Sequence, residues 1–188
     1  MAPSAREAIQ TAFLSLLEER PLRDITVKDI VQSCGVNRNS FYYHFKDIPA
    51  LLQEILAQQA EEIVARTAPA RSLADCLDTA ARLAMSHRRI VLHIRQSGDR
   101  EILDRNLMEL CRRVVCSYAD TAFGQVPILP EDREILIRFY QCECFGQIAA
   151  WMDGGMHYDV GAQFRRLCQL GEGMTELLLR RAAAEAAG

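Results

Sequence analysis

Residues 26–46 read TVKDIVQSCGVNRNSFYYHFK and predict two short helices joined by a tight turn. Thr26 precedes the first apolar-periodic residue, so its side chain can cap the first helix, with Asp29 three positions on as in a capping box. Gly35 stands where the chain must leave helical dihedrals, because glycine tolerates a positive φ angle. Asn37 then caps a second helix of about two turns. This layout is typical of a DNA-binding helix-turn-helix.

The second helix of this stretch has two chemically different faces. At about 100° per residue, polar and aromatic side chains project on one side while Phe41 projects on the other. Arginine can donate a bidentate pair to guanine and asparagine can read adenine, so Arg38 and Asn39 are candidate base readers. A merely solvated helix face is the alternative. The candidate DNA-contacting residues are Thr26, Lys28, Asn37, Arg38, Asn39, Ser40, Tyr42, Tyr43, His44 and Lys46.

Two stretches of the chain resemble a known family. Residues 9–56, with ITVKDIVQSCGV, NRNSFYYHFKD and Leu51-Leu52, resemble the N-terminal domain of TetR-family transcriptional regulators. Residues 139–155, FYQCECFGQIAAWMDGG, are similar to the C-terminal half of a TetR subgroup that includes the dihydroxyacetone-kinase operon regulators. The resemblance implies a homodimer that binds double-stranded DNA and an unknown small-molecule effector.

Prolines and apolar periodicity divide the rest of the chain into helices. Pro21 ends the first helix, and Pro49 opens the fourth in its first turn. Further helices are predicted over about 47–66, 72–86, 87–96, 99–123, 131–153 and 160–181, without strand-like alternation between them. The sequence therefore predicts an all-α fold of about nine helices. A three-helix helix-turn-helix DNA-binding domain is expected over residues 1–47, and a helical dimerisation and effector-binding domain over residues 48–188.

Composition narrows the class of protein. Among 188 residues, 49% are apolar, which is enough for a sizeable core. No stretch approaches the roughly 18 uncharged apolar residues of a membrane span, and Arg6 and Glu7 precede any apolar run that could resemble a signal peptide. Seven scattered cysteines without C-x-x-C spacing suit reduced thiols. We therefore expect a cytoplasmic protein that uses no membrane, metal or cofactor.

The charge balance is unusual for a DNA-binding segment. The whole chain has 22 basic and 25 acidic residues, a net charge of −3. Residues 1–47 carry equal numbers of cations and acids, namely Arg6, Arg20, Arg23, Lys28, Arg38 and Lys46 against Glu7, Glu18, Glu19, Asp24, Asp29 and Asp47. Many members of the family also have a second lysine two residues beyond Lys46, where this chain has Ile48. DNA affinity must therefore come from a few well-placed cations and from a dimer.

Two further sets of residues are predicted in the C-terminal part. Small and apolar residues at helical spacing suggest helix packing, and by family resemblance they pair with their symmetry mates in a four-helix interface. These are Gly146, Ala149, Ala150, Phe164, Leu167, Gly171, Met174 and Leu178. An effector pocket is expected from soft apolar groups with polar handles. Its candidates are Met85, His93, Met108, Cys111, Phe139, Tyr140, Phe145 and Trp151. Ordinary core packing is the alternative for both sets.

The sequence as a whole predicts an effector-responsive homodimeric repressor that binds a palindromic operator through the helix at 37–43. Activation stays open, because the sign of regulation depends on where the operator lies. One alternative is a coregulator of the same fold that acts through a partner protein instead of DNA. Another is a cysteine-based redox sensor. An enzyme is not expected, because the cysteines and histidines have no recognised triad or metal-ligand spacing.

Overall fold

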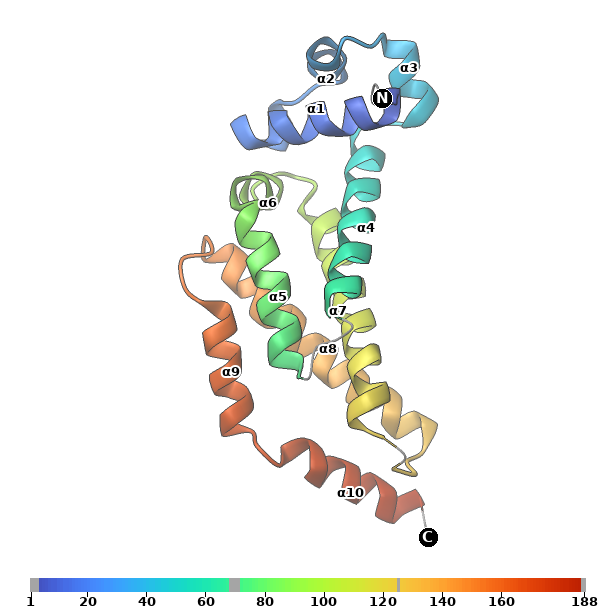
Figure 1. Cartoon of the computed structure of the whole chain (residues 1–188), viewed down its shortest axis with the longest axis vertical. Coiled ribbons are helices and arrows are strands. Elements are labelled where there is room, and N and C mark those ends of the chain that lie inside the picture. The colour runs from blue at the N-terminus through green and yellow to red at the C-terminus, as the bar shows by residue number, and fades with distance from the viewer. Residues whose placement is uncertain (1–3, 68–71, 125, 187–188) are drawn as a thin grey trace. The chain divides into compact units, whose positions relative to one another are not determined.

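The computed structural model describes residues 4–67, 72–124 and 126–186. Within these ranges the chain contains ten α-helices, one short 3-10 helix and no strand, which confirms the all-α prediction (Figure 1). The helices are α1 (Ala5–Glu19), η1 (Leu22–Asp24), α2 (Val27–Cys34), α3 (Arg38–His44), α4 (Ile48–Thr67), α5 (Leu73–Ser86), α6 (Arg88–Arg95), α7 (Arg100–Ala122), α8 (Pro130–Asp153), α9 (Val160–Leu170) and α10 (Met174–Ala186). Most predicted bounds agree to within one or two residues.

The predicted helix over 160–181 is wrong, and this raises the number of α-helices in the described residues from nine to ten. α9 ends at Leu170 and α10 begins at Met174. Between them Gly173 has a φ of +81°, a conformation that a residue with a β-carbon rarely adopts. The apolar residues keep a helical spacing on both sides of this break. The spacing of the apolar residues alone therefore does not reveal the break between α9 and α10.

The chain divides into two compact units. The first comprises Met1–Glu61 with Ala84–Asn106, and the second comprises Glu62–Leu83 with Leu107–Gly188. α6 therefore belongs to the same unit as the helix-turn-helix, and α1 and α6 are in contact. This division differs from the boundary expected after residue 47. That boundary stays a prediction about which part of the chain binds DNA.

The first unit is built around apolar side chains from α1 to α4. Ile9 and Phe13 of α1, Ile30 of α2, Phe41 of α3 and Leu51 of α4 have no exposed surface. Burying a side chain of this size stabilises the fold by roughly 1.5 to 3 kcal/mol. The helix-turn-helix is thus fixed by a core that α1 and α4 share with it.

Pro21 leaves the Leu17 carbonyl at the end of α1 without a backbone donor at the i+4 position. Proline has no N–H, so this carbonyl cannot accept the usual helical hydrogen bond from residue 21. Leu17 is fully buried, and an unsatisfied buried acceptor costs about 1 to 3 kcal/mol. Nδ1 of His93 on α6 lies 2.6 Å from the Leu17 carbonyl oxygen. His93 therefore contacts α1 and satisfies this group, a contact that the expected effector-pocket role did not include.

The second unit has a core of its own. Trp151 and Ile137 of α8, Val115 of α7 and Val160 of α9 are all at most 1% exposed. The indole N–H of Trp151 donates to the Tyr158 carbonyl at 2.8 Å, which ties the end of α8 to the turn before α9. Trp151 thus has a structural role at this turn.

Candidate nucleic-acid interface

The first helix of the helix-turn-helix begins with a reciprocal cap. The Asp29 backbone N–H donates to Thr26 Oγ1 at 3.3 Å, and the Asp29 carboxylate accepts from Thr26 N at 2.8 Å and from Thr26 Oγ1 at 2.7 Å. Gly35 ends the helix with a φ of 73°. The Asn37 side chain then accepts from the Ser40 backbone N–H at 2.8 Å and caps α3. All three predictions for this turn are confirmed.

α3 buries one face and exposes the other, as predicted. Phe41 is fully buried and Phe45, just after the helix, is 3% exposed. Tyr43 is 85% exposed and Tyr42 56% exposed, and Arg38 and Asn39 are exposed as well. His44 is half-buried, and its ring contacts those of Tyr43 and Phe45. The outward face therefore offers a guanidinium, an amide and two phenol groups to an approaching partner.

Ion pairs account for several of the charges that make residues 1–47 neutral. Arg6 pairs with Glu54 of α4 through two bonds of 3.0 and 2.6 Å. Arg20 lies 3.2 Å from the Asp29 carboxylate, and Arg23 lies 3.9 Å from Asp24. Hydrogen bonds from Thr26, assisted by the nearby Arg20 charge, lower the pKa of Asp29.

Three cations of this segment stay available to a polyanion. Lys28 in the first turn of α2, Arg38 at the start of α3 and Lys46 just after α3 are exposed, and the described residues form no ion pair with them. Each can meet a DNA phosphate or base edge without first breaking a salt bridge. The segment is neutral in sum but has free positive charge at the helix-turn-helix.

Thr26 is a weaker candidate than the other predicted DNA contacts. Its backbone N–H and its hydroxyl both donate to Asp29, so neither is free to donate to a phosphate. In contrast, the Asn37 side chain uses only its oxygen in the cap, which leaves its NH₂ group able to donate. Ser40 is half-buried between these exposed neighbours. The geometry therefore favours a capping role for Thr26.

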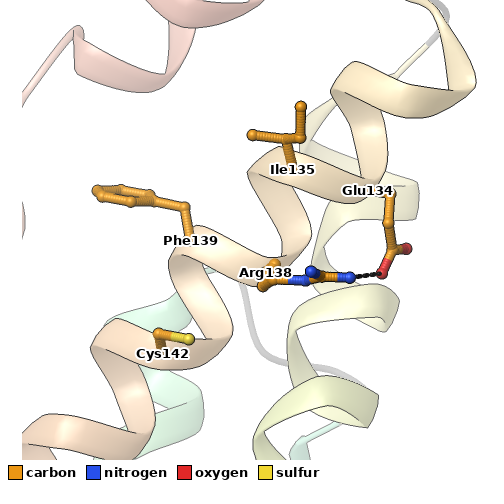
Figure 2. A pocket seen from close by; sticks show the side chains of 5 residues that line it. All are labelled: Glu134, Ile135, Arg138, Phe139 and Cys142. Atoms are coloured by element: carbon orange, nitrogen blue, oxygen red, sulfur yellow. Dashed lines mark ion pairs between the residues drawn. The ribbon is translucent and has the colours of Figure 1, made fainter.

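A second exposed surface lies on α8 and is apolar. Ile135 is 64% exposed and Phe139 is 48% exposed, and Cys142 follows on the same helical face. Together with Glu134 and Arg138 they line an open depression of about 330 Å³ (Figure 2). Arg138 lies 3.8 Å from Glu134, which also pairs with Arg112 of α7 at 2.8 Å. The depression is lined by one helix only, so it does not enclose a small molecule.

The predicted dimer-interface residues divide into exposed, half-buried and buried ones. Gly146, Ala150, Leu167 and Met174 are exposed, and Ala149, Gly171 and Leu178 are half-buried. Phe164 is 4% exposed and belongs to the core of its own chain, so the expectation that it faces a partner is wrong. Ile135, Cys142, Leu170 and Leu177 are also exposed, and the sequence prediction did not include them. The spacing of Ile135, Phe139, Cys142 and Gly146 is the signal that marks the α8 face.

The structure does not bring the predicted effector-pocket residues together into one described cavity. Phe139 and Met85 are exposed, and Met85 and His93 belong to the first unit while the other six belong to the second. Within the second unit Trp151 and Cys111 are buried, and Met108, Tyr140 and Phe145 are half-buried. The Tyr140 hydroxyl lies 2.6 Å from the Thr175 hydroxyl of α10. Phe139 is therefore misplaced in this set, because it lies on the outer face of α8.

The cysteines are all free thiols. Burial raises the pKa of Cys111 to about 12, and it also raises that of Cys144. Cys142 is exposed whereas Cys144, two residues away on the same helix, is buried, so the two point in different directions. Two buried thiols with high pKa values are poor nucleophiles. In the described ranges no group of three His, Cys, Asp or Glu side chains is placed to hold a metal ion.

An all-helical chain with a capped helix-turn-helix, an exposed polar face on its second helix and free cations beside it defines a DNA-binding protein of the helix-turn-helix class. The family described as "Bacterial regulatory proteins, tetR family" matches residues 9–55. A second family, described as "Transcriptional regulator C-terminal region", matches residues 71–173, more than half of the chain. The protein belongs to the TetR family of transcriptional regulators, which are not enzymes.

Individual relatives agree with this assignment. The HTH-type transcriptional regulator EthR of Mycobacterium tuberculosis is 41% identical over 49 residues, which are 26% of this chain and 23% of EthR. The chain thus covers less than a quarter of the length of the curated relatives it matches.

Solved structures share the fold over nearly the whole chain. The dihydroxyacetone kinase operon activator DhaS has a TM-score of 0.69 and 14% identity, covering 95% of this chain and 96% of DhaS. NalD of Pseudomonas aeruginosa, the secondary repressor of the MexAB-OprM multidrug efflux pump, has a TM-score of 0.59 and 21% identity, covering 89% and 95%. At these identities the similarity shows a shared fold. In the part of the chain that the structure describes, no helix is long and apolar enough to cross a membrane.

Proposed function

We propose that this regulator is an effector-responsive homodimeric repressor that binds a palindromic operator through α3. The observation that carries the proposal is the exposed face of α3, which presents Arg38, Asn39 and Tyr43. Lys28 and Lys46 are exposed as well and form no ion pair with the residues that the structure describes. Arg38 and Asn39 have the donor and acceptor geometry for base edges in the major groove. Lys28 and Lys46 suit phosphates, which fix the register of the helix on the duplex.

The exposed apolar faces of the second unit support a dimer. Ile135 and Phe139 of α8, together with Leu170, Met174 and Leu177 around α10, leave large apolar side chains in water. Large apolar side chains left exposed on neighbouring turns of one helix, as on α8, are typical of an interaction site. A two-fold dimer would cover the same face on both copies and present two α3 helices to half-sites about 34 Å apart, or a multiple of this distance.

An effector would act by favouring a conformation in which the two α3 helices are wrongly spaced. The typical coupling of about 1 to 3 kcal/mol lowers DNA affinity by roughly 5- to 150-fold. α4 runs from the first unit, which contains the helix-turn-helix, into the second, so we assign it the role of lever. The half-buried Met108, Tyr140 and Phe145 and the buried Cys111 and Trp151 stay candidates for the effector pocket.

Selection of bound sequences from a random duplex pool tests the proposal. Purified protein at about 0.1 M salt should enrich a palindrome, since surface charges are then screened beyond about 10 Å. Repression is then measured with that palindrome placed over the promoter of a reporter gene. A folded dimer that enriches no sequence would contradict direct operator binding, and it would favour a coregulator that acts through another protein.

A further inference from the structure

We propose that His93 is a positioning residue that couples α6 to the helix-turn-helix through the Leu17 carbonyl. It so sets how firmly the DNA-reading head, which comprises α1 to α3, is held. The inference rests on the proposed function, because its consequence is measured as operator affinity. The contact joins Leu17 and His93, which are 76 residues apart in the chain and lie in the same compact unit. It assigns His93 a role other than the expected effector contact.

The chemistry of the contact sets its direction. A carbonyl oxygen only accepts hydrogen bonds, so the proton between the two groups must be on Nδ1 of His93. The carbonyl is available because residue 21 is Pro21, which provides no N–H at the i+4 position. No backbone donor from α1 itself competes at that position. The imidazole thus occupies a site that the sequence of α1 leaves open, and a shift of α6 by roughly 1 Å would lengthen the 2.6 Å contact beyond a hydrogen bond.

α1 is held at both ends by different kinds of contact. Near its N-terminus, Arg6 and Gln10 donate to Glu54 of α4, and Arg6 is 52% exposed. Near its C-terminus, His93 of α6 donates to the part-buried Leu17 carbonyl without a charged partner. Salt screens the first contact and leaves the second nearly unchanged. Salt is therefore expected to weaken the Arg6 contact more than the α6 contact.

A movement of α6 would therefore change how firmly α1 is held. Ile90 and Ile94 of α6 are 9% and 2% exposed, so the helix is anchored by apolar packing on either side of His93. A displaced α6 would withdraw the only donor that we assign to the Leu17 carbonyl, and the end of α1 would loosen. Heads with looser orientations bind paired half-sites less tightly, because more freedom is lost on binding.

A matched pair of substitutions separates the hydrogen bond from the shape of the side chain. His93→Asn keeps a donor at the position of Nδ1, whereas His93→Leu has nearly the same shape and no donor. Gln96→Leu is the control, because it adds a leucine to the end of α6 at an exposed position. Operator affinity is measured by fluorescence anisotropy on the selected palindrome, with the active fraction determined by stoichiometric titration.

We expect His93→Leu to raise the dissociation constant three- to tenfold at full active fraction, and His93→Asn and Gln96→Leu to stay within twofold of wild type. Equal affinities for His93→Asn and His93→Leu would overturn the inference. A loss in His93→Leu that disappears after correction for the active fraction would also overturn it, because the residue would then serve stability alone.

Hydrogen–deuterium exchange tests the coupling without DNA. In His93→Leu the backbone amides of α1 to α3 should exchange at least threefold faster, while those of α8 stay unchanged and His93→Asn matches wild type. Unchanged exchange in α1 to α3 of His93→Leu would contradict the coupling. If the wild-type protein selects no operator, the proposed function fails, and the exchange comparison still decides whether His93 holds the head.

Discussion

The helix-turn-helix and the outer face of α8 both expose large side chains, but the two surfaces differ in chemistry. At α3 the exposed groups are Tyr42 and Tyr43, with hydroxyls at their tips, beside the cation of Arg38. On α8 they are Ile135 and Phe139, which have no polar atom in the side chain. The first surface is stable in water and suited to a polyanion. The second gains free energy only when another apolar surface covers it.

The two regions also differ in what they require from outside the chain. The caps that shape the helix-turn-helix are formed by neighbours three residues apart, such as Thr26 with Asp29 and Asn37 with Ser40. On α8 the exposed side chains of Ile135 and Phe139 have no polar atom that could make such a bond. We therefore expect the exposed face of α3 to be shaped within one chain, and the apolar face of α8 to require a second molecule to cover it.

The largest effect that this comparison predicts is at Phe139. Phe139→Asp should raise the dimer dissociation constant at least about 100-fold, because each copy loses apolar burial and would place a charge in the interface. Both copies of a two-fold dimer carry the substitution, so the loss of binding free energy occurs twice. Sedimentation equilibrium measures the dissociation constant, and circular dichroism checks that the helices persist.

Leu129→Asp is the matched control. Leu129 is 44% exposed, close to the 48% of Phe139, but it precedes α8 at its N-cap position and lies outside the α8 face. Its substitution should leave the dimer intact. Equal effects of the two substitutions would show that the α8 face has no special role, and the contrast between the two regions would fail.

The next largest effects are expected at Arg38 and Lys46. Arg38→Ala should cost about 1 to 3 kcal/mol of operator affinity and relax specificity at one base pair of each half-site, because a bidentate base contact is lost. Lys46→Ala should weaken binding to all sequences similarly and lower the salt slope by about 1 for each head. Both are measured by titration against the palindrome and against random DNA at several salt concentrations.

Arg38 reads bases only if its loss discriminates between the two DNAs. If Arg38→Ala weakened specific and random DNA by the same factor, the residue would be a phosphate contact like Lys46. The tyrosines or Asn39 would then have to carry the sequence preference. Neither outcome depends on the dimer face, so this pair of variants tests the head by itself.

The sequence predicts the helix-turn-helix well because its determinants are local. Thr26, Gly35 and Asn37 act within a few residues of their own positions, and the structure confirms each of them. The same holds for Pro49 in the first turn of α4, where Asp47 caps the helix by accepting from the Ala50 N–H at 2.8 Å. Capping and proline rules need no knowledge of the tertiary fold.

What the sequence did not predict depends on contacts between distant residues. His93 was assigned to a pocket from its residue type, but its partner is a carbonyl that Pro21 makes available 76 residues earlier. Phe139 and Phe164 have the same type and similar helical spacing, yet one is exposed and the other is buried. Periodicity shows which residues share a helix face. It does not show whether that face meets the chain's own core or a partner.

A smaller effect is expected at Thr26, and it tests whether the residue is a cap or a DNA contact. Thr26→Ala removes the reciprocal bonds with Asp29 and should lower the free energy of unfolding by about 1 kcal/mol. Its salt slope for DNA binding should equal that of wild type, because its hydrogen-bond donors are already used. Urea denaturation and salt titration measure the two quantities. A reduced slope with unchanged stability would restore Thr26 to the set of phosphate contacts.

The smallest effect concerns pH and the carboxylate of Asp29. Hydrogen bonds from Thr26, with the Arg20 charge, lower the pKa of Asp29 in the folded state. A depressed folded pKa gives stability that is present above the unfolded value of about 3.9 and is lost as the pH falls through the folded value. Asp29→Asn lacks this pH-dependent contribution to stability. The stability difference between wild type and Asp29→Asn should therefore be largest at neutral pH and shrink below about pH 4.

Glu7 offers an independent test of the same physics in α1. Its carboxylate accepts from the Ser4 N–H at 2.8 Å and the Ser4 hydroxyl at 3.0 Å, and these bonds lower its pKa. Glu7→Gln should show the same narrowing of the stability difference as the pH falls. Both effects stay small because the two carboxylates lie near solvent and salt screens them. A difference that grows toward low pH in both variants would mean that the caps are stronger when protonated, contrary to the geometry of both boxes.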